Sequence, residues 1–143
     1  MEILEKNVAN ELANRIVTDF GDGNYRKERY IFDQITRLPD HYVSNRVPLS
    51  PLLASLGVAE LLVILDPHPN NSSCVKDVSV HFGVENEWAY KVTVDEVRAV
   101  VSNEDCDLYL LNTNGDLIAV GCHEDSIEEG ERIVWAPTPE ANT

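Results

Sequence analysis

The densest group of side chains that could do chemistry is Cys122, His123, Glu124 and Asp125. A thiol, an imidazole and two carboxylates can bind a metal ion, and a Cys–His pair can form a thiolate nucleophile. Consecutive residues at a strand end point in different directions, however, whereas a zinc site needs three or four converging ligands. We therefore interpret this group as a strand end that leads into a helix cap, with Asp125 near the helix dipole.

The position of Cys106 relative to this group depends on an expected hairpin turn. If the turn is Thr113-Asn114-Gly115, Cys106 pairs across the strands with Cys122. If the turn is Asn114-Gly115 alone, Cys106 faces His123 instead. No glycine-rich elbow, oxyanion segment or third orienting residue accompanies either arrangement. The sequence therefore favours small buried cysteines, and it predicts neither a catalytic residue nor a metal or cofactor site.

Charge is distributed unevenly along the chain. Of its 25 acidic and 11 basic side chains, residues 51–143 contain 17 acidic and 4 basic ones, so this part carries -13 of the net charge of -14. Nucleic-acid binding needs clustered Lys and Arg, so the composition argues against it and favours a basic protein partner. The candidate partner-binding residues are Glu104, Asp105, Asp107, Asp116, Glu124, Asp125, Glu128, Glu129 and Glu131.

A length of 143 residues fits one domain, which we place at 1–136, with a proline-containing C-terminal tail at 137–143. The N-terminus lacks the basic and apolar regions of a signal peptide, and no apolar run is long enough to span a bilayer. We therefore expect a cytoplasmic protein with no membrane partner. Its three cysteines are then expected to be reduced.

Helices are predicted mainly at the N-terminus. Apolar residues at four-residue steps favour a helix over 3–20, and a second helix is expected over 26–38. A short helical turn should end near Gly57. A further helix should begin at Thr93 through a capping box with Glu96. A last short helix would be capped by Asp125 or Ser126.

Strands are predicted in the remaining middle of the chain. The apolar run 60–65 indicates a strand buried on both faces, followed by a loop over 66–73. Alternation over 77–84 indicates a half-buried strand, and 88–92 another. Residues 107–121 form the expected hairpin. The fold class is therefore α+β, with a central, mainly antiparallel sheet of four to five strands and N-terminal helices packed mainly on one face.

The hairpin segment resembles a pattern found in small bacterial proteins grouped with toxin-immunity families. The resemblance lies in the aromatic strand that begins Asp107-Leu-Tyr-Leu-Leu, the turn Asn114-Gly115-Asp116-Leu-Ile and the acidic step His123-Glu124-Asp125. Many such chains have two adjacent histidines where this one has His123-Glu124. The resemblance implies a small protein that neutralises a toxin and is not an enzyme. Other interpretations are an adaptor domain with a different partner and a small Cys-dependent or metal enzyme.

Overall fold

The structure is a computed structural model that describes residues 1–21, 23–26, 28–35, 46–101, 107–121, 127–128 and 131–136. The elements follow in the order β1 (Glu2–Ile3), α1 (Lys6–Phe20), α2 (Ile31–Gln34), β2 (Arg46–Pro48), α4 (Leu49–Leu56), β3 (Glu60–Leu65), the 3-10 turn η1 (Pro69–Asn71), α5 (Ser72–Phe82), β4 (Ala89–Thr93), α6 (Val94–Val101), β5 (Leu108–Leu111), β6 (Leu117–Gly121), β7 (Ile127–Glu128) and β8 (Glu131–Trp135).

The strands form one antiparallel sheet in the order β1-β4-β3-β5-β6-β8-β2, and β7 pairs with β8 beside this path. The predicted α+β class and the mainly antiparallel sheet are therefore confirmed. The sheet has more strands than the four to five predicted. The strands that were not predicted are β1, β2 and β7, which have two or three residues each, and β8, which has five. Ile3 was expected to begin a helix, and no element was predicted over Arg46–Pro48.

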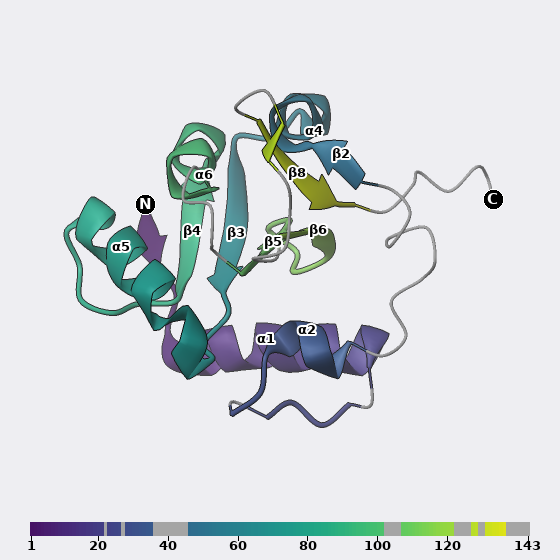
Figure 1. Ribbon diagram of the computed structural model, residues 1–143, viewed down its shortest axis with the longest axis vertical. Helices are drawn as coiled ribbons and strands as arrows, with labels where there is room; N and C mark the ends of the chain where they lie inside the picture. The colour runs from purple at the N-terminus through teal and green to yellow at the C-terminus, as the bar shows by residue number, and fades with distance from the viewer. Residues whose placement is uncertain are drawn as a thin grey trace.

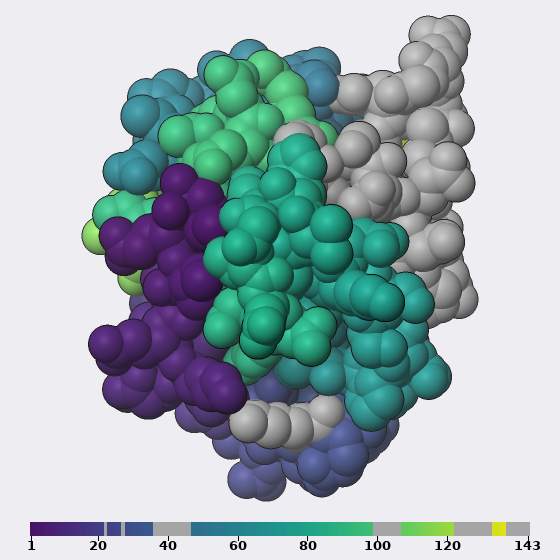
Figure 2. Space-filling view, turned by 90° about the vertical axis from the view of Figure 1, so that its left-hand side faces the viewer, coloured from purple at the N-terminus to yellow at the C-terminus, as the bar shows by residue number. Residues whose placement is uncertain are grey.

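Helices cover both faces of this sheet. The N-terminal helices α1 and α2 pack on one face, as predicted, and α4, α5 and α6 cover the other face. Leu61, Val63 and Leu65 of β3 pack with α4, α5 and α6. The alternate residues Leu62 and Ile64 pack with α1 and α2. Figure 1 shows α1 and α2 together at the bottom of the view and α4 and α6 at the top. Figure 2 shows α5, in teal, on the surface between α6 at the top and the segment around α2 at the bottom. A strand that is apolar at successive positions needs cover on both faces, and this arrangement provides it.

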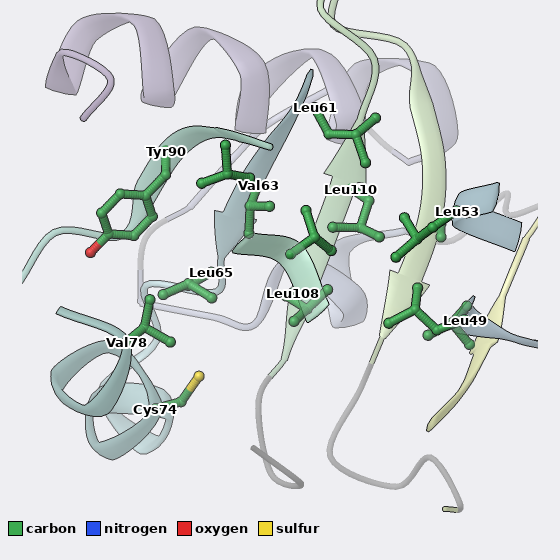
Figure 3. Packing of buried hydrophobic residues seen from close by; sticks show 14 residues of the cluster. Leu49, Leu53, Leu61, Val63, Leu65, Cys74, Val78, Tyr90, Leu108 and Leu110 are labelled. Atoms are coloured by element: carbon green, nitrogen blue, oxygen red, sulfur yellow. The ribbon is translucent and has the colours of Figure 1, made fainter. Parts of the chain in front are cut away.

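The core between the sheet and α5 explains a second correction. Residues 77–84 were predicted as a strand, but 77–82 belong to α5. Cys74 and Val78 are one helical turn apart and point from α5 toward the sheet (Figure 3). Val80, which the strand pattern placed inside, is 68% exposed. The apolar residues 78, 80, 82 and 84 thus imitate strand alternation in a segment whose buried residues follow the helical period.

Three local predictions around β4 and α6 can be compared directly. The predicted strand near 88–92 is confirmed as β4, and the helix after it as α6. The capping box is also present, because the Thr93 N–H donates to Glu96 Oε1 at 2.9 Å and the Glu96 N–H donates to Thr93 Oγ1 at 3.2 Å. The predicted last helix, after Asp125 or Ser126, is wrong where the structure describes it, because Ile127–Glu128 is a strand. Its two expected cap residues lie outside the described residues.

The N-terminal helices differ from their predicted bounds. α1 begins at Lys6 because Glu2 and Ile3 pair with Lys91 and Tyr90 of β4. The second helix was predicted over 26–38, but in the structure α2 covers Ile31–Gln34. Residues 36–38 lie outside the described residues. Within the described part of the chain, no helix combines the length and apolar character needed to cross a membrane.

Candidate functional site

The structure describes only some of the nine acidic residues predicted to bind a partner. Asp107 and Asp116 are described with their side chains, and Glu128 and Glu131 through their backbone alone. The remaining five, namely Glu104, Asp105, Glu124, Asp125 and Glu129, lie outside the described residues, as do Cys106, Cys122 and His123. The structure therefore locates Asp107 and Asp116 at the two ends of the β5–β6 hairpin, and Glu128 and Glu131 in the β7–β8 pair.

Asp116 lies at the turn of the hairpin and is already paired with a cation. Arg15 of α1 donates from Nη2 to Asp116 Oδ1 at 2.5 Å and from Nη1 to the Asn114 carbonyl oxygen at 2.9 Å. Asn112 organises the turn, because its Oδ1 accepts from the backbone N–H groups of Asn114 and Asp116. Gly115 has φ +88°, and an added Cβ would lie 2.8 Å from Arg15 Nη1. The turn is thus docked on α1.

Asp107 lies at the opposite end of β5 and is only 3% exposed. Its backbone N–H donates to Asn71 Oδ1, and its carbonyl oxygen accepts from the N–H of Asp66 at 2.8 Å. A four-residue strand separates Asp107 from the turn, which corresponds to roughly 14 Å at the rise of an antiparallel strand. Asp107 and Asp116 therefore do not belong to one exposed patch.

Glu128 and Glu131 are brought together at the backbone level. They are Cα partners in the antiparallel β7–β8 pair. Like charges at directly opposite positions of an antiparallel pair are destabilising. The register places the two acidic residues directly opposite each other on neighbouring strands.

A buried polar cluster at the end of β3 was not predicted from the sequence. Asp66 is fully buried, and burial raises its pKa to about 6, against the lowering effect of hydrogen bonds from the backbone of His68 and Ile31. Oδ2 accepts from the Ile31 N–H at 2.7 Å and from the Tyr109 hydroxyl at 3.4 Å. Oδ1 accepts from the His68 N–H at 3.1 Å. Because both oxygens already have donors, the carboxylate serves as a structural acceptor.

The buried aspartates also raise the pKa values of two nearby tyrosines. Burial, followed by the charge of Asp66, raises the pKa of Tyr25 to about 12. Burial and the Asp107 carboxylate likewise raise the pKa of Tyr30. Tyr30 stacks on the His68 ring at a centroid distance of 4.1 Å and an interplanar angle of 10°. The two buried aspartates therefore produce a negative potential at the corner where β3 leads into η1 and α5.

An open cavity of about 270 Å3 lies at the same corner. Its walls come from the segment after β3, the first turns of α5 and the segment before β4. The lining residues are Pro67, His68, Ser72, Val75, Asn86 and Trp88. The sequence signal that marks this corner is an aspartate placed directly after an apolar strand, followed by a proline and a histidine. The prediction treated that segment as a plain loop.

The cysteine prediction can be tested at one position. Cys74 is 7% exposed on α5 and is disulfide-bonded, which differs from the expectation that all three cysteines are reduced. The prediction of small buried cysteines concerned Cys106 and Cys122, which lie outside the described residues. Among the described residues, no group of three or more His, Cys, Asp or Glu side chains is arranged to hold a metal ion.

Comparison with known proteins returned no family model, no curated protein and no solved structure that matches this chain.

Proposed function

We propose that this chain is a stoichiometric inhibitor, which binds a basic protein partner such as a nuclease-like toxin domain in the manner of an immunity protein. The observation that carries the proposal is the charge asymmetry, since residues 51–143 contain 17 acidic and only 4 basic side chains. A protein that acts on nucleic acid needs a cationic cleft. A carboxylate-rich surface is attracted to such a cleft and can cover it.

The proposed contact surface is narrower than the nine residues predicted from the sequence. Asp107 is buried and Asp116 pairs with Arg15, so neither supplies a free charge to the surface. The β7–β8 pair supports the surface because Glu128 and Glu131 occupy opposite positions. The remaining members are assigned from the sequence alone. The proposed surface is therefore Glu104, Asp105, Glu124, Asp125, Glu128, Glu129 and Glu131.

Charge reversal coupled to capture tests the proposal. The immobilised protein is incubated with a native lysate at low salt, and retained proteins are eluted with salt and identified by mass spectrometry. The test variant replaces four acidic residues of the proposed surface with lysine: Glu124, Asp125, Glu128 and Glu129. The control variant makes the same change of charge at four exposed glutamates elsewhere: Glu2, Glu5, Glu11 and Glu28.

The proposal expects a basic protein that the wild type and the control retain near stoichiometrically and that the test variant loses. The purified partner should also lose its activity when one equivalent of the inhibitor is added. Absence of a specific partner in a lysate shown to contain the candidate toxin would contradict the proposal. Equal retention by both charge-reversed variants would contradict the assigned surface.

A further inference from the structure

The cavity at the β3–α5 corner combines apolar and polar lining residues, and the proposed function assigns it no role. Pro67, Val75 and Trp88 supply apolar wall, and Ser72 and Asn86 supply polar groups that can accept hydrogen bonds. Trp88 is the aromatic member with the largest side chain. At about 270 Å3 the cavity is slightly smaller than a typical drug-sized pocket, so it suits one planar group and a short stem.

One wall of the cavity is held in place by Glu87. Its backbone N–H donates to Ser79 Oγ at 2.9 Å, and its carbonyl oxygen accepts from the Tyr90 hydroxyl at 2.6 Å. The carbonyl oxygen of the next residue, Trp88, accepts from the Leu65 N–H at 2.7 Å. Asn86, directly before Glu87, has φ +37°, a left-handed conformation that is uncommon outside glycine. The hydrogen bonds of Glu87 and Trp88 therefore hold the backbone next to Asn86 in place.

The facing wall is fixed through His68. Its backbone N–H donates to Asp66, its ring stacks on Tyr30, and its Nδ1 accepts from the Asn70 N–H at 3.0 Å. These contacts hold both the backbone and the ring. The cavity therefore needs little ordering when a ligand enters, which lowers the entropic cost of binding.

The surroundings of the cavity favour a positive charge. The buried Asp66 carboxylate accepts a hydrogen bond from the N–H of the lining residue His68, and Glu85 and Glu87 flank Asn86 in the sequence. None of the six lining residues that the structure describes is Lys or Arg. A planar cation could lie against the Trp88 wall and donate hydrogen bonds to Asn86 and Ser72.

We propose that this cavity binds the guanidinium group of an arginine side chain presented by the basic protein partner. Arginine fits better than lysine, because its planar group can stack on an aromatic residue and its several N–H groups can reach both polar residues. Its methylene stem would contact Val75 and Pro67. The inference deepens the proposed function and rests on it, since it names a side chain that the basic partner would insert.

The test uses small probes and needs no partner protein. The full chain, labelled with ¹⁵N, is titrated with Nα-acetyl-L-arginine amide and followed by NMR. The citrulline analogue is the planar neutral control and the lysine analogue the non-planar cationic control. The expected result is saturable shifts at Trp88, Asn86 and Ser72. Binding of citrulline should be roughly fivefold weaker, in line with a cation–aromatic contact of about 1 kcal/mol.

Matched variants separate the cavity from general acidity. Asn86→Asp should strengthen arginine binding several-fold, because it adds a carboxylate to the wall, and should leave citrulline unchanged. Asn114→Asp makes the same change of charge at the hairpin turn and should alter neither probe. Trp88→Leu should abolish the saturable shifts. If that variant does not fold, the comparison of Asn86→Asp with Asn114→Asp still decides the question.

The outcomes also separate this inference from the proposed function. Equal binding of arginine and citrulline would overturn the inference and indicate a neutral planar ligand. Shifts spread over exposed carboxylates, without saturation at the cavity residues, would overturn it as well. Saturable arginine binding at the cavity supports the site even where the lysate capture finds no basic partner, a result that counts against the inhibitor function alone.

Discussion

The carboxylate of Asp66, the residue that follows β3, accepts a 2.7 Å hydrogen bond from the backbone N–H of Ile31, the first residue of α2. The N–H groups at the start of a helix have no partner within the helix, so this contact caps α2 from a distant strand. It also connects the sheet to the helix layer formed by α1 and α2. Asp66 therefore connects β3 to α2 through a fixed hydrogen bond, next to the proposed cavity.

The titration of Asp66 should make stability depend on pH. Burial raises the pKa of Asp66 to about 6, above the ordinary value of 3.8 that applies to the unfolded chain. Between these values the folded state holds the proton and the unfolded state does not, so the free energy of unfolding falls as pH rises. The contribution is fully present below pH 3.8 and is lost by about pH 6. Its size is about 3 kcal/mol, which follows from the difference between these two pKa values.

Urea unfolding of the wild type and of Asp66→Asn between pH 4 and pH 7 isolates this contribution. The other acidic groups cancel in the difference between the two proteins. The stability advantage of the wild type over the variant should shrink by up to about 3 kcal/mol over that interval. A difference that stays constant with pH would mean that Asp66 is ionised throughout and that its burial does not shift its titration.

The contact between Arg15 and the hairpin turn should stabilise the fold measurably. Arg15→Ala removes hydrogen bonds to Asn114 and Asp116, so we expect a loss of about 1–2 kcal/mol in the free energy of unfolding. Arg98→Ala is the matched control. Its side chain is equally exposed at 46%, but among the described residues its ion pair is with Asp95 of the same helix. That substitution should cost less than about 0.5 kcal/mol. Equal losses would show that Arg15 makes no specific contact with the turn.

The close approach of Gly115 to α1 gives a second prediction. Gly115→Ala places a methyl group 2.8 Å from Arg15 Nη1 and also strains a residue at φ +88°. Gly57→Ala strains a residue at φ +64° but meets nothing within 4 Å, so it measures the conformational cost alone, about 1–2 kcal/mol. We expect the change at Gly115 to cost more because Arg15 must move.

A double-mutant cycle checks that explanation. When Arg15 is already Ala, the cost of Gly115→Ala should fall toward that of Gly57→Ala, since the displaced guanidinium is absent. An unchanged cost in the Arg15→Ala background would assign the extra strain to Leu12, whose Cδ2 atom lies 3.0 Å from the added methyl position.

The elements predicted correctly are those whose signal is local. The run 60–65 is apolar at consecutive positions, and the Thr93–Glu96 capping box requires only two residues at a fixed spacing. Both are visible in a single sequence. The segment 77–84 failed because apolar residues at every second position also suit part of a helix, and only the packing of Cys74 and Val78 on the sheet distinguishes the two.

The candidate site was less accessible to sequence reasoning. Asp107 and Asp116 look equivalent in an acidic chain, but one is buried at the end of β5 and the other pairs with Arg15, which is 101 positions away. Long-range pairing of this kind is decided by tertiary structure. The cavity is likewise built from three separate segments, and the positive φ of Asn86 has no sequence signal.

The association rate of the captured basic partner, measured by stopped flow at low and high salt, tests the central claim most directly. Steering by the acidic surface predicts a fast rate that falls steeply with salt. The variant with lysine at Glu124, Asp125, Glu128 and Glu129 should associate at least about tenfold more slowly at low salt while its circular dichroism stays unchanged. An unchanged association rate at low salt would contradict the assignment of this surface.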